Sequence, residues 1–180
     1  MDNKRARFEG TVGPYVSAAY NLARWLTRDQ HDAEDVVQEA LLRAFRFFDG
    51  FHGGDARAWM LKIVRNTCFS WLQANRPSDI TMVDAGDLNE LPLADYSGRE
   101  DDPETLALRR TSAAELQEAL AGLPAPLREV LVLREMEGLS YKEIAAVIES
   151  PIGTVMSRLA RGRADLRSAL RRAHCKGGRP

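Results

Sequence analysis

The amino-acid sequence predicts an all-α protein in which two small helical domains are joined by a flexible acidic linker. In residues 1–77 and 105–175, apolar side chains recur every three or four positions, as in amphipathic helices, and the alternation typical of strands is absent. Residues 78–104 show neither period, and they contain two prolines and nine Asp or Glu against one Arg. We therefore expect one domain in each block, the linker between them, and a short tail at 176–180.

The first domain is expected to contain three helices, at about 11–27, 31–48 and 55–75. Each has a recurring apolar stripe, which is what a helix needs to pack against its neighbours. The glycine-rich turn DGFHGGD separates the last two helices.

The second domain is expected to open with a capping box, Ser112 with Glu115, at the start of a short helix. Pro124 and Pro126 interrupt this helix, and the apolar run LREVLVLREME forms the next one. Gly138 follows that run in the position where glycine commonly ends a helix.

A second capping box, Ser140 with Glu143, opens the short helix YKEIAAVI, and Leu139 and Ile144 are spaced as a hydrophobic staple. Ser150 and Pro151 are predicted as the N-cap and first residue of the last helix. A short helix followed closely by a basic one is the helix-turn-helix arrangement found in many DNA-binding proteins.

The last helix separates into two faces at about 100° per residue. Its predicted apolar side consists of Ile152, Val155, Leu159, Gly162, Leu166 and Leu170. Its predicted outer side consists of Thr154, Ser157, Arg158, Arg161, Asp165 and Ser168, with Arg163 at the flank. Hydroxyl and guanidinium groups of this kind bind base edges and phosphates in a major groove, although a solvated basic face is also possible.

Charge and composition favour a partner that is a polyanion and argue against a membrane protein, a secreted protein or a metal-binding protein. The chain has a net charge of −1, but residues 151–180 carry eight Arg or Lys and one Asp, which favours a polyanion partner at that end. No apolar run approaches the roughly 18 residues of a membrane span, and no signal peptide is recognisable, so we expect a cytoplasmic protein. Two cysteines and three scattered histidines form no disulfide framework or metal-ligand spacing, so we expect no metal and no cofactor.

The helix predicted at 31–48 has an acidic outer face. Its expected core stripe consists of Ala33, Val36, Val37, Ala40, Leu41, Ala44, Phe47 and Phe48. Asp35, Gln38 and Glu39 are expected to face outward together with Leu42 and Phe45. Apolar residues within a charged outer face are typical of a protein–protein contact. A catalytic or metal site would need carboxylates that converge in an enclosed pocket, which neighbouring positions on an exposed helix face do not provide. An acidic face that is only solvated is the other alternative.

The helix predicted at 55–75 combines basic and aromatic residues on its outer side. We expect Met60, Ile63, Val64, Thr67, Cys68 and Trp71 to face inward, and Lys62, Arg65, Asn66, Phe69, Gln73 and Arg76 to face outward, with Trp59 at the edge. Basic groups neutralise phosphate and rings stack on unpaired bases, so this face suits a single strand of nucleic acid. Packing of Trp59 on a neighbouring helix is an equal alternative.

Two motifs in this order resemble a known family. DAEDVVQEALLRAFRFFDGF, followed by ARAWMLKIVRN, resembles region 2 of bacterial sigma factors, and LPAPLREVLVLREMEGLSYKEIAAVIESPIGTVMSRLARGRADLR resembles their region 4. With only a short linker between them, the match is to the extracytoplasmic-function group of the sigma-70 family. The resemblance implies a promoter-specificity subunit of RNA polymerase with no catalytic activity of its own.

The resemblance also implies three sets of contacts. The polymerase β′ clamp helices would bind Asp35, Gln38, Glu39, Leu41 and Phe45. We add Leu42 to this set because it is expected on the same outer face. The non-template strand of the −10 element would contact the loop from Phe51 to Arg57, and also Trp59, Lys62, Arg65 and Asn66. We add Phe69 because it is expected on the same outer face. The −35 duplex would contact Arg134, Lys142, Thr154, Met156, Ser157, Arg158, Arg161 and Arg163. Region 4 would also pack on the polymerase β flap, and an anti-sigma factor would hold the protein inactive.

The chain departs from the common pattern of the family at Ala56, Met156, Ala160 and Glu149. The last of these occupies the turn of the helix-turn-helix, where glycine is frequent. Two other hypotheses are kept for comparison: a stand-alone helix-turn-helix regulator, which gives Leu42 and Phe45 no role, and an enzyme that uses the acidic cluster.

Overall fold

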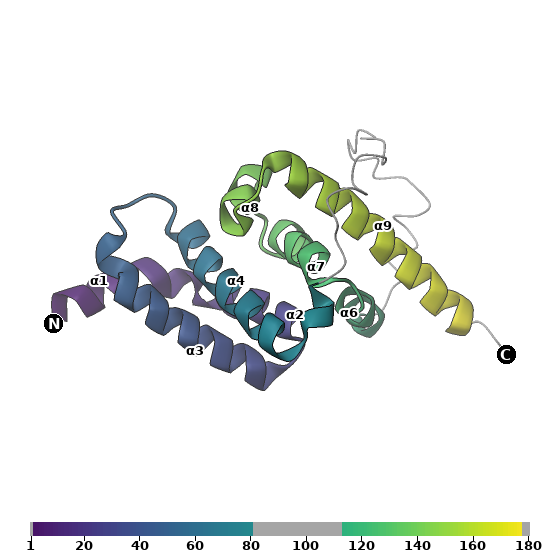
Figure 1. The fold of residues 1–180 in the computed structure, drawn as a ribbon, viewed down its shortest axis with the longest axis horizontal. Coiled ribbons are helices and arrows are strands. Elements are labelled where there is room, and N and C mark those ends of the chain that lie inside the picture. Colours follow the sequence, from purple (N-terminus) through teal and green to yellow (C-terminus); the bar gives the residue numbers. More distant parts are fainter. Residues whose placement is uncertain (1, 81–112, 178–180) are drawn as a thin grey trace.

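The structure, a computed structural model, describes residues 2–80 and 113–177. Regular structure within these ranges is helical, with no strand. Figure 1 shows two groups of helices packed side by side, which we call the N-terminal half (residues 2–80) and the C-terminal half (residues 113–177). The predicted all-α class is confirmed.

The N-terminal half contains α1 (Asp2–Val12), α2 (Val16–Thr27), α3 (Gln30–Phe47) and α4 (Ala56–Asn75). The helix expected at 11–27 is observed as α2, which starts at Val16; a 3-10 turn at Gly13–Tyr15 that contains Pro14 separates it from α1. Proline lacks a backbone N–H and disfavours an uninterrupted helix at this point. Helix α1 was not predicted, because its sequence, DNKRARFEGTV, has no continuous apolar stripe.

Capping residues explain where α3 and α4 begin. Arg28 ends α2 in the left-handed conformation, with φ 62°. The Asp29 carboxylate then accepts hydrogen bonds from the amides of His31 at 2.8 Å and Asp32 at 3.1 Å, which fixes the start of α3. Asp55 accepts in the same way from the amide of Ala58 at 3.0 Å and starts α4.

The C-terminal half contains α6 (Ala113–Ala121), α7 (Ala125–Leu131), a π-helical turn at Val132–Met136, α8 (Tyr141–Ile148) and α9 (Ile152–Gly177). Two predicted local features are confirmed: Gly138 has a φ of 69°, and Ser140 and Glu143 form both bonds of a capping box. The capping box predicted at Ser112 involves a residue outside the described ranges.

The start of α9 differs from the prediction by one residue. The Pro151 carbonyl accepts hydrogen bonds from the amides of Thr154 at 3.0 Å and Val155 at 3.2 Å, so Pro151, rather than Ser150, is the capping residue. The Ser150 hydroxyl instead donates to the Ile148 carbonyl at 3.3 Å.

One buried apolar cluster extends through both halves, from Leu22 and Leu26 of α2 through Val64 of α4 to Val130 and Ile144. Figure 1 shows α4 between the other helices of the N-terminal half and α8, while α3 and α9 lie on opposite sides of the molecule. Helix α4 is consequently buried on two sides. This explains why Leu61 and Leu72 are buried although the wheel did not assign them to the inner stripe.

Residues at the start of the predicted linker are ordered. Pro77–Asp79 form a 3-10 turn after α4, and the Asp79 carboxylate pairs with the Arg28 guanidinium at 2.5 Å. The rest of the predicted linker, residues 81–104, lies outside the described ranges. Along the part of the chain that is described, no helix is long and apolar enough to cross a membrane.

The two cysteines differ in exposure, and we expect them to differ in reactivity. Cys68 is fully buried, and burial and the nearby Glu129 carboxylate raise the pKa of its thiol, whereas Cys175 is exposed. Because the thiolate is the reactive form, a raised pKa leaves Cys68 as the unreactive thiol at pH 8. Titration with a disulfide reagent should show one fast thiol in the native protein and a second only after unfolding. Two fast thiols under native conditions would contradict this packing.

Candidate functional site

The predicted outer face of α3 is present in the structure. Asp35, Gln38 and Glu39 are exposed, and Leu42 beside them is 58% exposed. We call these four residues the acidic face of α3. Glu39 pairs with Arg43 on the same helix at 2.7 Å, and Gln38, although exposed, also lines an open groove between α2 and α3. Beside Gln38, Val16, Tyr20 and Val37 line an open groove of 430 Å³ between α2 and α3.

The aromatic residues at the end of α3 exchange their predicted places. Phe45 was expected to face outward, but it is half-buried, because the α1 ring of Phe8 packs edge-on against it at 5.2 Å and Lys4 lies over its ring at 5.0 Å. Phe47 was expected in the core, but it is 68% exposed. Leu41 is partly buried against the core. The acidic face therefore does not include Phe45 in this structure.

Two of the predicted −10 candidates, Phe51 and Trp59, pack on each other and on Phe48. Phe51, in the loop before α4, lies 4.9 Å from the Trp59 ring and 6.3 Å from the Phe48 ring. Phe51 and Trp59 are partly buried, and Phe48 is buried. The alternative for Trp59 was packing on a neighbouring helix; the structure shows its ring packed on Phe48, directly after α3, and on Phe51 in the following loop.

The polar candidates of α4 form one surface, which we call the basic face of α4: Arg57, Lys62, Arg65 and Asn66. Every one of them bonds to a side chain of the C-terminal half. Lys62 pairs with Glu149 at 2.8 Å, and Asn66 donates to the same carboxylate at 3.4 Å. Arg57 donates to the Glu137 carbonyl and, at 3.3 Å, to its carboxylate.

Arg65 makes the most buried of these contacts. Its guanidinium donates two hydrogen bonds to the Glu129 carboxylate, at 2.8 Å and 3.2 Å, and lies 4.0 Å from the centre of the Phe69 ring. Two parallel bonds between guanidinium and carboxylate are stronger and more directional than a single one. The outward-facing Phe69 expected from the sequence is thus partly covered by Arg65.

Glu129 connects the two halves. Its carboxylate is fully buried and also accepts from Arg158 of α9 at 3.3 Å, so one acid pairs with a −10 candidate and a −35 candidate. Burial raises the pKa of Glu129, and the two arginines oppose that shift. Burial likewise lowers the pKa of Arg158. The prediction that Arg158 faces outward is wrong: its side chain is 18% exposed because it bends toward Glu129.

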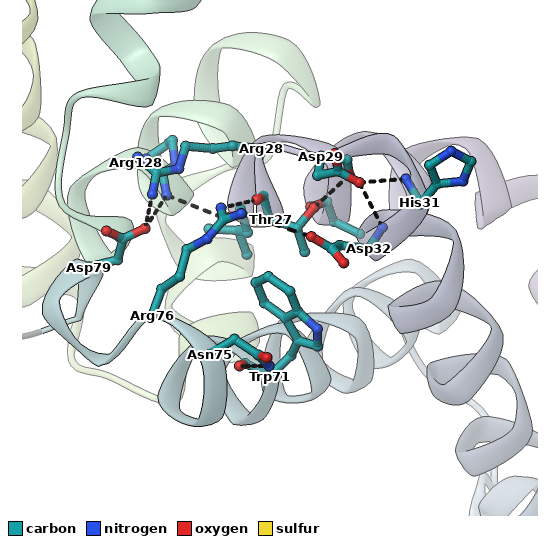
Figure 2. Close-up of polar contacts among 12 residues, drawn as sticks. Thr27, Arg28, Asp29, His31, Asp32, Trp71, Asn75, Arg76, Asp79 and Arg128 are labelled. Atoms are coloured by element: carbon teal, nitrogen blue, oxygen red, sulfur yellow. Dashed lines mark hydrogen bonds and ion pairs between the residues drawn. The ribbon is translucent and has the colours of Figure 1, made fainter.

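Arg128, the neighbour of Glu129, fixes the other end of the boundary between the halves (Figure 2). Its fully buried guanidinium donates to the carbonyls of Ala121 and Leu123 at 2.9 Å and to that of Leu26 in α2 at 3.2 Å. Burial and the nearby Arg28 lower its pKa to about 10, and Asp79 partly offsets this. In Figure 2 Arg28 and Arg128 converge on Asp79.

The same corner holds the end of α4 against α2. Arg76 donates to the Thr27 carbonyl at 2.5 Å, pairs more loosely with Asp32 at 3.9 Å and lies over the Trp71 ring (Figure 2). The Thr27 hydroxyl in turn donates to the carbonyls of Ala23 and Asp29. These contacts fix the turn that carries Arg28 toward Asp79.

The remaining −35 candidates lie on α9, on α8 and, for Arg134, in the π-helical turn before α8. Met156 is 38% exposed and Lys142 is exposed, whereas Thr154, Ser157 and Arg161 are half-buried. Arg163 pairs with Glu135 at 2.6 Å. Arg134 donates to the Leu139 carbonyl at 2.8 Å and lies over the Tyr141 ring. Ile152, predicted in the core, is 46% exposed, because it starts α9 at the edge of the helix-turn-helix.

Sequence reasoning missed several residues that join the halves, among them Arg28, Asp79, Arg128, Glu129 and Glu137. A signal was present for two of them, because Arg128 and Glu129 are charges inside the otherwise apolar run LREVLVLREME. Charged side chains on the inner face of a buried helix need partners, and each of these two finds partners in both halves. Within the described ranges, no three His, Cys, Asp or Glu side chains gather as a metal site.

Comparison with protein families gives two matches. Residues 11–77 match the model of sigma-70 region 2, and residues 113–166 match that of sigma-70 region 4. The first covers α2 to α4 with the acidic face of α3 and the basic face of α4. The second covers α6 to α8 and the first part of α9, as far as Leu166.

Individual proteins give the same result. The chain is 37% identical over 174 residues to the RNA polymerase sigma-H factor of Pseudomonas aeruginosa, covering 93% of this chain and 88% of that one. It is 38% identical to the extracytoplasmic-function (ECF) RNA polymerase sigma-E factor of Escherichia coli, covering 73% of this chain and 70% of that one.

Two solved structures resemble the fold over both halves. The sigma factor RpoE, crystallised with the anti-sigma factor NepR from Bartonella quintana, has a TM-score of 0.67 and 25% identity, covering 92% of this chain and 97% of that one. CnrH, in complex with the cytosolic domain of CnrY, has a TM-score of 0.63 and 26% identity, covering 94% of this chain and 90% of that one.

Proposed function

The chain belongs to the extracytoplasmic-function group of the sigma-70 family of RNA polymerase sigma factors, and from this membership we propose how its surfaces divide the work of promoter recognition. Its function is promoter-specific initiation of transcription: it recruits core RNA polymerase to promoters with −35 and −10 elements and promotes strand opening. The observation that carries this conclusion is the presence of both matched regions, in order, on the two helical halves.

The acidic face of α3 is proposed as the main contact with the β′ clamp helices. Its support is the exposure of Asp35, Gln38, Glu39 and Leu42 on a helix that Figure 1 shows away from the C-terminal half. An exposed leucine within charged residues supplies apolar contact area, while the charges select and orient the partner. Leu41 and Phe45 are proposed to support this face from beneath, since both are partly buried.

The two DNA contacts are proposed on α4 and α9. The basic face of α4, with Phe51, Trp59 and Phe69, would hold the melted −10 strand by phosphate neutralisation and stacking. The α9 residues Thr154, Met156, Ser157 and Arg161 would enter the −35 major groove, with Arg134, Lys142, Arg158 and Arg163 near the phosphates. The domain limits 1–77 and 105–175, with 78–104 as linker, are part of this proposal.

Further parts of the proposal concern partners and location. An anti-sigma factor is proposed as the regulatory partner, because the similar sigma factor RpoE was crystallised with one. CnrH was likewise solved in complex with a partner, the cytosolic domain of CnrY. The protein is proposed to act in the cytoplasm, where core polymerase is found, with no catalytic reaction and no cofactor of its own. A stand-alone regulator is disfavoured, because it leaves the region 2 match without a role.

Promoter selection by the reconstituted holoenzyme tests this function. The purified protein should co-elute with core RNA polymerase in gel filtration. Sequencing of genomic fragments retained by the complex should then return two short sequence elements separated by a constant spacer. Retention of the same fragments by the protein without polymerase would instead support the stand-alone regulator.

A further inference from the structure

The basic face of α4 is occupied by acids of the C-terminal half. Arg57 bonds Glu137, Lys62 and Asn66 bond Glu149, and Arg65 bonds Glu129. We propose that the free protein is closed by these contacts, which block the −10 surface, and that Glu149 is the side chain placed in this chain to hold it closed. The proposal rests on the assignment of α4 to the −10 strand.

The backbone at Glu149 indicates that its side chain is retained for a contact. Glu149 is the C-cap of α8 in the left-handed conformation, with φ 53°. Glycine adopts this conformation without steric cost, whereas a residue with a Cβ is strained there. Both polar partners that the described residues give the Glu149 carboxylate, Lys62 and Asn66, lie on α4. The side chain thus serves the contact between the halves rather than the turn that carries it.

The three acids differ in what they do within the C-terminal half itself. Glu129 is fully buried and also bonds Arg158, so its removal would leave buried arginines unpaired and damage the fold. Glu137 contributes its backbone carbonyl as well as its carboxylate to Arg57. The Glu149 side chain is 53% exposed, so it can be changed without burying an unpaired group. Glu149 is therefore the acid whose substitution isolates closure from folding.

Closure and DNA binding compete for the same groups. Lys62, Arg65 and Arg57 cannot neutralise strand phosphates while they pair with carboxylates of the C-terminal half. The acidic face of α3 lies on the other side of the N-terminal half, so closure leaves it open to a partner (Figure 1). Polymerase can accordingly bind the closed protein first, and separation of the halves then frees the −10 surface.

The test measures the separation of the two halves in the free, full-length protein. Spin labels are attached to Gln73→Cys on α4 and Ala160→Cys on α9, both exposed positions, in a Cys175→Ser background that leaves the buried Cys68. Glu149→Gln should raise the population of long distances about threefold, as expected for loss of one exposed ion pair. Glu149→Gly should raise it at least as much, while unfolding of the protein shifts to no lower temperature because the strain is relieved.

A matched control and a rescue complete the distance test. Glu135→Gln removes the same charge from the C-terminal half but breaks a pair with Arg163 inside that half, so it should leave the distances unchanged. Combining Glu149→Lys with Lys62→Glu should restore short distances. Unchanged distances in both Glu149→Gln and Glu149→Gly would overturn the proposal, and so would an equal opening by Glu135→Gln.

A second measurement tests closure of the two halves independently of the proposal that α4 binds the −10 strand. Binding of a labelled single-stranded −10 oligonucleotide by the free protein should tighten about threefold in Glu149→Gly, in proportion to the open population. Longer distances without tighter binding would support closure and overturn the assignment of α4 to the strand. Tight strand binding with unchanged distances would support the assignment and overturn closure.

Discussion

Reversing the charge of Asp35 and Glu39 together, by Asp35→Lys with Glu39→Lys, is expected to weaken binding to core RNA polymerase about 100-fold or more. Both carboxylates are exposed on the acidic face of α3, and like charges brought together at an interface cost several kcal/mol, where each 1.4 kcal/mol is tenfold in affinity. Neither residue contributes to the core, so the helical circular-dichroism spectrum should not change. The affinity can be measured with immobilised core enzyme.

The control for this variant carries the same change of charge elsewhere. Glu9 on α1 and Glu118 on α6 are exposed acids outside the acidic face. The variant with Glu9→Lys and Glu118→Lys should bind core polymerase with an affinity within about threefold of that of the unaltered protein, because charges at or beyond the rim of an interface contribute little to affinity. If the two double variants lose affinity equally, net charge rather than the α3 face governs binding. If neither loses affinity, the polymerase contact has been assigned to the wrong surface.

Replacing Arg128 by methionine is expected to lower the free energy of unfolding by about 3–5 kcal/mol, because it removes three hydrogen bonds from a buried charged donor, each worth about 1.5–3 kcal/mol. Methionine fills most of the volume but leaves the carbonyls of Ala121, Leu123 and Leu26 with one donor fewer in a buried place. Urea unfolding followed by circular dichroism gives this value.

Arg28→Met is the matched comparison. Arg28 also donates to the Ala121 carbonyl and pairs with Asp79, but its side chain is 32% exposed, so water can replace it and the loss should be about 1 kcal/mol or less. A loss from Arg128→Met no greater than that from Arg28→Met would show that the buried guanidinium does not hold the halves together.

Local features of the fold were predictable because their causes are close in the sequence. The Ser140–Glu143 capping box and the positive φ of Gly138 depend on residues within a few positions of each other. Val155, Leu159, Gly162 and Leu170 are buried on one side of α9, as their helical spacing predicts. At Gly162 an added Cβ would lie 3.1 Å from Leu131, so glycine permits this close approach.

The errors arise where packing depends on distant segments. Phe45 is half-buried because Phe8 of α1 covers it, and α1 has no stripe by which it could have been predicted. Phe47 is 68% exposed at the last position of α3. Arg158 turns inward because Glu129 lies buried beneath it, and the pairing of Glu129 with Arg65 depends on how the halves meet. A helical wheel treats one helix at a time and contains none of this information.

The sequence predicted which residues form the candidate site, but not which partners those residues have in the free protein. Basic and aromatic residues on α4 indicated a strand-binding surface, and the family resemblance assigned that surface to the −10 element. Their partners in the free protein, Glu129, Glu137 and Glu149, lie 64 or more positions away in the sequence. Charges on separate domains show no periodic relation, so only the folded arrangement pairs them.

Run-off transcription with core RNA polymerase tests the central claim, promoter-specific initiation, most directly. On a template recovered in the promoter selection, the unaltered protein should produce one transcript of defined length. That transcript should disappear when either the −35 or the −10 element is scrambled, and when the protein carries Asp35→Lys with Glu39→Lys. A folded protein that binds no core enzyme and yields no transcript from any recovered promoter would contradict the account.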